Sequence, residues 1–298
     1  MTSKNVLKYI VIVLVAGNLA LLSYVLLGAF DRKPEPMPNP NGYDDFVKAA
    51  PLLRGNPVAY QKMTLAELED LAGANTEAMS LLESGISKQC RVVTDYSSSS
   101  NFSFVVLPRL ASLKQAALLF CAEGRLAELE GRTNDAAQLY LDGIRFGQDV
   151  GQGGVFIEKL VGVACEASAE KPLEKVFMSL NSKHCARIAQ ALETMNAQEE
   201  TDEQVLHHEN EFSRKFGGIR GQLARLVMFK NIHESEKKVF IKIHTSQLHR
   251  RQLMIAFASR AYELERGKPP PNTAALVPDY LKQIPKDPIT GTNLTLHP

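Results

Sequence analysis

The chain has 298 residues, of which 45% are hydrophobic and 22% are charged, and its formal net charge is +1 at pH 7. Beyond the first 42 residues this content is enough to bury a core, as one large domain or two small ones. Four cysteines lie far apart without a C-x-x-C pair, which excludes a zinc knuckle and a thioredoxin-type redox site.

The first feature of the chain is an uncharged, largely apolar run over residues 9–30. At about 1.5 Å per residue, a helix of this length crosses the core of a bilayer. The run is longer than the apolar region of a signal peptide, about 7–15 residues, and Gly28 with Ala29 makes a poor cleavage site. Residues 1–30 are therefore expected to be an uncleaved transmembrane anchor, contacting the lipid bilayer through residues 9–30, with a short cytoplasmic tail.

The orientation of this anchor depends on the charged residues on either side of it and on the length of the segment before it. Lys4 and Lys8 precede the run, and a mixture of acidic and basic residues follows it from Asp31 to Glu35, so the charge bias is slight. A leading tail of eight residues is most simply left in the cytoplasm. We therefore expect a single-pass protein of the cell membrane whose C-terminal domain is extracytoplasmic, which in a bacterium means periplasmic.

Residues 31–42, DRKPEPMPNPNG, alternate proline with polar residues. Such a segment prefers the extended polyproline II conformation, which acts as a stiff spacer. The sequence predicts a proline-rich linker that holds the body away from the bilayer.

Residues 43–267 show apolar residues at intervals of three and four and few alternating runs, which predicts an all-α domain. Thr64 and Glu67 have the spacing of a capping box, so a helix should begin at Leu65. A break is expected around residues 73–75, and a second helical run should continue to about Ser87.

Residues 95–103, DYSSSSNFS, lack periodicity and are rich in side chains that bond to their own backbone. No G-x-S-x-G motif surrounds the serines, and no histidine occurs before His184. The segment is predicted to be a loop and not a site with a nucleophilic serine.

A long helix is expected from Leu107, with Gly131 as its left-handed cap and Thr133 or Asn134 at the start of the next helix. Residues 120–144 resemble a tetratricopeptide repeat, in which small residues let two paired helices approach and aromatic residues fill the space between them. The matching positions are Phe120, Gly124, Gly131, Ala136, Tyr140 and Gly143. No second copy follows at a 34-residue interval, so we expect a bundle with one repeat-like pair.

The next segment, residues 151–177, continues the helical pattern. Gly153 and Gly154 do not follow a strand and are expected to form a plain turn between helices, not a phosphate-binding loop. A turn near Lys175 would set Cys165 beside Cys185 across a helical hairpin, where they form either a disulfide or two buried small hydrophobic groups. Asn181 or Ser182 is the expected cap of a helix around residues 185–195.

Charge is divided between two neighbouring segments. Residues 193–211 contain seven acidic residues and no lysine or arginine, whereas residues 214–251 contain ten basic residues and two acidic ones. The basic segment would bind anionic lipid, bind an acidic protein partner, or pair with the acidic run inside the fold. Nucleic acid is not expected as a partner, because no aromatic platform interleaves the basic residues.

The histidines offer the nearest approach to a metal or catalytic site. His207, His208, Glu209 and Glu211 stand together, but HHENE is not H-E-x-x-H, and only one of the two histidines at a time can share a face with Glu211. A helix also points His244 and His249 about 140° apart. We expect isolated surface histidines, and the sequence predicts no catalytic, cofactor-binding or metal site.

A helix over residues 253–266 is expected to end at Gly267, and the prolines that follow turn the chain into a tail, residues 268–298. Apolar residues of this tail should dock on the helical core: Leu276, Val277, Tyr280, Leu281 and Ile284. The tail resembles the C-terminal element of type II secretion pseudopilins, which has a glycine turn, a leucine-valine step, a tyrosine-leucine step and an aspartate-proline turn. The corresponding residues are Gly267, Leu276 with Val277, Tyr280 with Leu281, and Asp287 with Pro288.

Anchor, spacer, the segment NPNGYDDFVKAA, helical body and LVPDYL tail together resemble a group of uncharacterised bacterial single-pass membrane proteins. We therefore expect a membrane-anchored scaffold or protein-interaction module that is not an enzyme. The alternatives are an envelope hydrolase whose site is assembled from distant residues, with the 207–211 cluster as its candidate, and a pseudopilin-like assembly component.

Overall fold

The computed structural model describes residues 36–93, 105–227 and 229–296, with side chains outside residues 216–232. The predicted anchor at residues 9–30, most of the 31–42 linker and the 95–103 loop lie outside these ranges. Within them, no helix combines the length and the apolar character needed to span a bilayer. Residues 38–298 form one compact unit, separate from residues 1–37.

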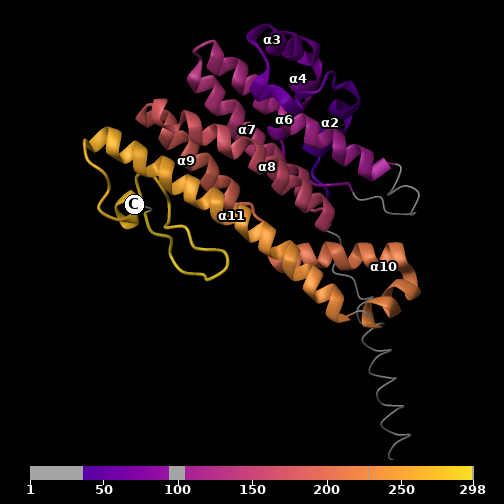
Figure 1. Ribbon diagram of the computed structural model, residues 1–298. Coiled ribbons are helices and arrows are strands. Elements are labelled where there is room, and N and C mark those ends of the chain that lie inside the picture. The colour runs from indigo at the N-terminus through magenta and orange to yellow at the C-terminus, as the bar shows by residue number, and fades with distance from the viewer. Residues whose placement is uncertain (1–35, 94–104, 228, 297–298) are drawn as a thin grey trace, which may run out of the picture. The chain divides into compact units, whose positions relative to one another are not determined.

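The described part of this unit is helical, as predicted, and its only β-type pairing is an isolated bridge between Lys286 and Asn293. Helices α6, α7, α8, α9 and α11 lie side by side, α2 to α4 cover one end, and the C-terminal tail lies along α11 (Figure 1). The α-helices are α2 (Gly42–Ala49), α3 (Leu65–Ala74), α4 (Thr76–Ile86), α6 (Leu107–Leu129), α7 (Thr133–Gly151), α8 (Phe156–Val176), α9 (Ser182–Ala197), α10 (Asp202–Val227) and α11 (Phe229–Arg266). The short 3-10 helices are η1 (Ala50–Leu52), η2 (Pro57–Lys62), η4 (Phe177–Ser179) and η5 (Thr273–Leu276).

The N-terminal helices are fixed by local caps and by aromatic packing. The capping box at α3 is confirmed, because Thr64 Oγ1 accepts from Glu67 N and Glu67 Oε2 accepts from Thr64 N. The break between α3 and α4 falls at Asn75, as expected. The ring of Phe46 on α2 meets Phe146 on α7 edge to face, with centroids 4.8 Å apart, which joins these helices to the central layer.

The α6–α7 pair has the predicted geometry. Gly131 has φ +77°, which is the left-handed conformation of a helix cap, and α7 begins at Thr133. A Cβ on Gly124 would overlap the ring of Tyr140, so glycine is what lets the buried tyrosine pack against α6 at this position. The tyrosine hydroxyl donates to Glu128 at the end of the same helix.

Helices α7 and α8 cross closely after a turn at Gly153, which has φ +74°. A Cβ on Gly147 would lie 2.6 Å from Glu166 N, and one on Gly162 would lie 2.5 Å from Gly147 O. The glycines at residues 153 and 154 thus form a turn between helices, as predicted. The other contacts of α8 include α11, where Glu166 meets Arg250.

Helix α9 starts at the predicted cap, because Asn181 Oδ1 accepts from His184 N at 3.0 Å. All four cysteines are buried free thiols. The disulfide alternative for Cys165 and Cys185 is therefore wrong, and the two side chains act as small hydrophobic groups in the core.

Helix α11 is longer than the predicted 253–266 segment, because it begins at Phe229, and it ends before Gly267 at φ +70°. The tail that follows is held by both apolar and polar contacts. Leu276, Tyr280 and Leu281 are buried, and Glu193 Oε1 on α9 accepts from Lys282 N at 2.7 Å.

Candidate functional site

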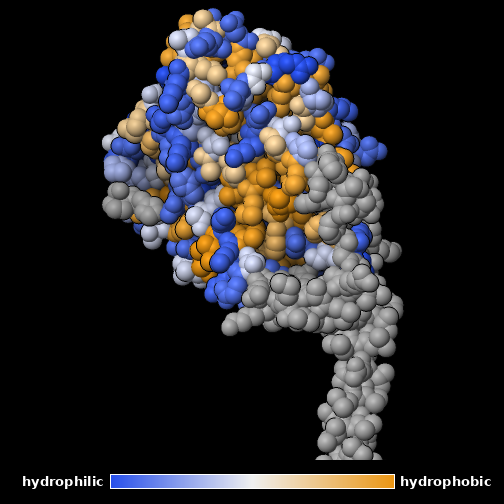
Figure 2. Space-filling view, turned by 45° about the vertical axis from the view of Figure 1, so that its right-hand side comes forward, coloured by the Kyte–Doolittle hydropathy of each residue, from blue (hydrophilic) through white to orange (hydrophobic). Residues whose placement is uncertain are grey.

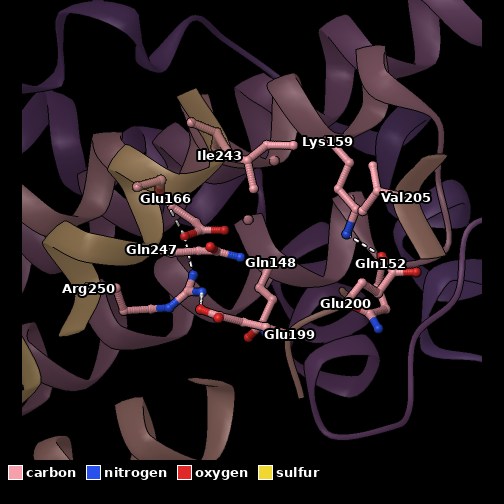
Figure 3. Close-up of a pocket in the computed structure, with 15 residues that line it drawn as sticks. Gln148, Gln152, Lys159, Glu166, Glu199, Glu200, Val205, Ile243, Gln247 and Arg250 are labelled. Carbon is pink, nitrogen blue, oxygen red and sulfur yellow. Dashed lines mark hydrogen bonds and ion pairs between the residues drawn. The ribbon is translucent and has the colours of Figure 1, made fainter. Parts of the chain in front are cut away.

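A group of buried charged side chains lies between α8, α11 and the α9–α10 connection. We call it the ionic cluster: Lys159, Glu166, Glu199, Glu200 and Arg250. Figure 3 shows these side chains around a small cavity, with Glu166 and Glu199 pointing toward the guanidinium of Arg250.

Arg250 is the centre of the ionic cluster. Its side chain is 3% exposed and pairs with Glu166 through Nη1 and with Glu199 through Nη2. Arg251 also pairs with Glu199, at 2.6 Å, and Ser246 Oγ donates to Glu166 at 3.3 Å. Each buried carboxylate therefore has more than one polar partner, which is what burial of a charge requires.

Glu200 holds the other end of the cluster. It pairs with Lys159, lies 3.0 Å from His208 Nε2, and accepts from Gly153 N at 3.0 Å. Burial alone would raise the pKa of Glu200, but the hydrogen bond from His208, the charge and hydrogen bond of Lys159 and the Gly153 N–H together lower it to about 2. This carboxylate ties the start of α8 to α10.

The pKa values of two further carboxyl groups on α8 are shifted in the opposite direction, upward. Burial raises the pKa of Glu166 above the usual glutamate value even though Arg250 lies beside it. Burial, together with the neighbouring Glu166 charge, raises the pKa of Glu170 to about 8. His249 Nε2 lies 3.6 Å from Glu170 but only 2.9 Å from Glu174, so its nearer partner is the more exposed carboxylate.

The cavity inside the ionic cluster has a volume of about 40 Å³. Ligand pockets for organic molecules are about 300–1,000 Å³, whereas a water molecule needs only about 10–15 Å³ of such space. The cavity is therefore suited to water. The cluster is best understood as an ionic lock that joins α8, α10 and α11.

The sequence candidates at residues 207–211 have separate partners. His207 Nε2 lies 4.0 Å from Glu211, His208 pairs with Glu200, and Glu209 Oε2 accepts from Phe156 N at the start of α8. Across the described ranges, no group of three or more His, Cys, Asp or Glu side chains has the geometry to hold a metal ion. His207 and Glu211 thus stay together on α10, whereas His208 and Glu209 contact Glu200 and the start of α8.

His244 and His249 contact carboxylates on two different helices. His244 Nε2 lies 2.9 Å from Asp202 Oδ1, and His249 pairs with Glu174 on α8. Both contacts join α11 to neighbouring helices. The expectation of isolated surface histidines is therefore wrong for His244 and His249.

The basic segment 214–251 is divided in the structure. Arg250 and Arg251 pair with the acidic run through Glu199, and Arg214 and Lys215 each lie 3.7 Å from Glu211, so the internal-pairing interpretation holds for these four residues. Lys237, Lys238 and Lys242 are exposed on α11. The adjacency of an acidic run and a basic run was the only sequence signal for the ionic cluster, and it did not identify the members on α8.

Comparison with known proteins adds no assignment: no protein-family model matches the chain, and neither the curated proteins nor the solved structures give a match.

Proposed function

We propose that the protein is a membrane-anchored, extracytoplasmic helical scaffold whose body binds an acidic protein partner. The observation that carries this proposal is the basic arm formed by the end of α10 and the start of α11. We define this arm as residues 212–242, which contain eight basic and two acidic residues, a formal net charge of +6.

The basic arm begins on α10 and continues into α11. Helix α10 packs chiefly against α11, whereas α11 packs extensively against α9 and α8 farther along its length. Figure 1 shows α10 and the first turns of α11 at one end of the body, beside the layer of central helices. Among the arm residues whose side chains are described, Lys237, Lys238 and Lys242 are accessible to a partner.

The side chains of the arm that the structure describes support an interaction surface. Lys237, Lys238 and Lys242 are exposed, and Ile241 beside them is 52% exposed. The arm therefore combines positive charge with an accessible apolar group, a combination that suits an acidic surface with an apolar centre.

The body also has accessible apolar surface outside the arm. Figure 2 shows an apolar area in the middle of one face, with hydrophilic side chains on its left and above it. Val105 and Leu107, at the start of α6, are 54% and 40% exposed. Contiguous apolar surface of this kind is typical of protein interaction sites.

The membrane part of the proposal is supported by the uncharged run at residues 9–30 and by the stiff proline spacer after it. The test is fractionation of cells followed by protease treatment of spheroplasts. We expect the full-length chain in the membrane fraction and the body accessible from outside. Recovery of the native chain in the soluble fraction without detergent would contradict the anchor.

The partner is tested with a photo-crosslinking amino acid placed at residue 238 or 242 in intact membranes, with residue 183 on α9 as the exposed control position. We expect a discrete cross-linked protein from the arm and none from the control. The triple variant Lys237→Glu, Lys238→Glu, Lys242→Glu should lose the product, whereas Lys183→Glu should retain it. Cross-linking to lipid alone, or no difference between the two positions, would contradict a protein partner at this arm.

A further inference from the structure

The end of the body formed by α3 and α4 carries a charge opposite to that of the basic arm. We define the acidic end as residues 64–87, which contain five acidic residues and no lysine, arginine or histidine, a formal net charge of −5. All five acidic side chains are exposed: Glu67, Glu69, Asp70, Glu77 and Glu83. The body therefore has one strongly acidic surface and one strongly basic surface.

The charge of the acidic end is not matched by the helices around it. Glu67 belongs to the capping box of α3, and the other four carboxylates form no ion pair with any residue that the structure describes. Burial and the nearby charge of Glu83 raise the pKa of Glu123 on α6 to about 7, although Arg132 opposes this shift. The negative charge is therefore available to cations of another molecule.

Three lysines of the basic arm are unmatched in the same way. Lys237, Lys238 and Lys242 are exposed, and within the described ranges none of them forms an ion pair. Figure 1 shows α3 and α4 at the opposite end of the body from α10 and the start of α11. The arm therefore does not meet the acidic end of its own chain, and its charges are left for another molecule.

Each of the two surfaces also has an exposed apolar side chain beside its charges. On the arm, Ile241 is 52% exposed and lies one helical turn after Lys237 and Lys238. At the acidic end, Leu65 is 42% exposed and lies one turn before Glu69. Contact between the two apolar side chains would place lysines beside carboxylates. An apolar centre with opposite charges around it is the arrangement of a specific protein interface.

We propose that the acidic partner of the basic arm is a second copy of this chain, whose acidic end receives Lys237, Lys238 and Lys242. This inference rests on the proposed function, because it identifies the partner of the same arm. The two surfaces are different, so the contact is head to tail. A pair joined by one such contact keeps one arm and one acidic end, which either close on each other or add further copies.

The experiment uses the full-length protein purified in detergent, as an equal mixture of isotope-labelled and unlabelled chains. A photo-crosslinking amino acid replaces Lys242, and mass spectrometry locates the cross-links. We expect cross-links from residue 242 to residues 65–87 that join labelled to unlabelled chains. Raising the salt concentration from about 50 mM to about 500 mM should weaken association at least about tenfold, because exposed charges are screened.

The arm is tested by the triple variant Lys237→Glu, Lys238→Glu, Lys242→Glu, which we call the arm variant. Its association, measured by sedimentation, should be at least about tenfold weaker than that of the wild type, because attractive pairs become repulsive. Lys183→Glu on α9 also reverses an exposed lysine, and this matched control should associate normally.

The acidic end is tested by Glu69→Lys, Asp70→Lys, Glu77→Lys, which we call the acidic-end variant. Glu67 is left unchanged, so the capping box of α3 is retained. This variant should also associate at least about tenfold more weakly than the wild type, for the same reason as the arm variant.

A mixture of the two variants separates docking from folding. The acidic-end variant keeps the wild-type arm, and the arm variant keeps the wild-type acidic end, so the mixture contains a complementary pair of surfaces that neither variant has alone. We expect complexes that contain both chains, cross-linked from residue 242 of the acidic-end variant to residues 65–87 of the arm variant. Absence of such complexes, with both variants folded by circular dichroism, would overturn the proposal.

Association of the acidic-end variant at wild-type strength would also overturn it, as would cross-links from residue 242 to another part of the second copy. These results are distinguishable from failure of the proposed function. If the purified chain does not associate but intact membranes give a cross-link to a different protein, self-assembly is overturned and the acidic partner of the arm stands. If neither preparation gives a cross-linked protein, both proposals are wrong.

Discussion

The interface between α6 and α7 and the interface between α8 and α11 are both buried, but they are built from different groups. The first is made of small and aromatic side chains, with Gly124 against the ring of Tyr140. The second contains Glu166, Glu170 and Arg250, each at most 5% exposed. One interface depends on volume and the other on charge.

This difference determines what each interface tolerates. Close-packed apolar groups respond to the addition or removal of a single carbon, and they are insensitive to pH. Buried ions have the opposite behaviour, because their stability depends on which partner carries a proton. Substitutions in the two interfaces should therefore be distinguishable by their pH dependence as well as by their size.

The largest effect is expected from Arg250→Met. This change keeps most of the side-chain volume but leaves Glu166 without its buried cation, and it removes one of the two arginines on Glu199. Breaking a buried ion pair on one side costs about 3–5 kcal/mol, so the free energy of unfolding should fall by that amount at pH 7. Urea denaturation followed by circular dichroism measures it.

The control for this change is Arg132→Met. Arg132 pairs with Glu130 and Asp135, but its side chain is 49% exposed. A surface pair contributes little, so we expect a change below about 1 kcal/mol. Equal losses in the free energy of unfolding would show that burial does not increase the contribution of Arg250 to stability.

Glu170→Gln should stabilise the protein at neutral pH. The pKa of Glu170 is about 8 in the folded state against 4.5 ordinarily, so the wild type loses stability as pH rises from 4.5 to 8. Glutamine removes this loss, and the gain should reach about 3 kcal/mol at pH 7 and vanish below pH 4.5. Denaturation curves across this range test the sign, with Glu174→Gln on the 44% exposed neighbour as a control that changes little.

Glu200→Gln should have the opposite sign. The folded pKa of about 2 lies below the usual 4.5, so the wild-type carboxylate contributes stability above pH 4.5 that is lost as pH falls toward 2. The variant should lose about 3 kcal/mol at pH 7 and approach the wild type as pH falls through this window. A loss that is constant from pH 7 to pH 3 would indicate a steric cause in place of the charge.

The two interfaces also differ in how far the sequence predicted them. The α6–α7 pair was predicted because its signals are local: Gly131 caps one helix, Thr133 starts the next, and Gly124 and Tyr140 are only 16 positions apart. The cap before α3 was found for the same reason, since Thr64 and Glu67 lie three residues apart. Short-range patterns report directly on short-range structure.

The ionic cluster was predicted only in outline. The sequence showed an acidic run beside a basic run, but Arg250 meets Glu166 at a separation of 84 residues and Glu199 at a separation of 51. A glutamate on an amphipathic helix gives no local sign of whether it will be buried. Its burial here follows from Gly147 and Gly162, which let α7 and α8 approach. Ion pairs between residues so far apart in the sequence depend on the tertiary fold, so local sequence patterns do not predict them.

The apolar interface is tested by a pair of glycine substitutions. A Cβ on Gly124 would overlap the ring of Tyr140, whereas a Cβ on Gly73 in α3 would meet nothing within 4 Å. Alanine favours a helix over glycine by up to about 1 kcal/mol, so Gly73→Ala should stabilise the protein by about that amount. At Gly124 the overlap outweighs this gain, and Gly124→Ala should destabilise it by about 1–3 kcal/mol. The stability lost in Gly124→Ala should be the same at pH 5 and pH 8, because only side-chain volume is responsible. The loss should also be smaller when Tyr140 is first replaced by leucine. A loss that depends on pH would mean that the two interfaces are not separate.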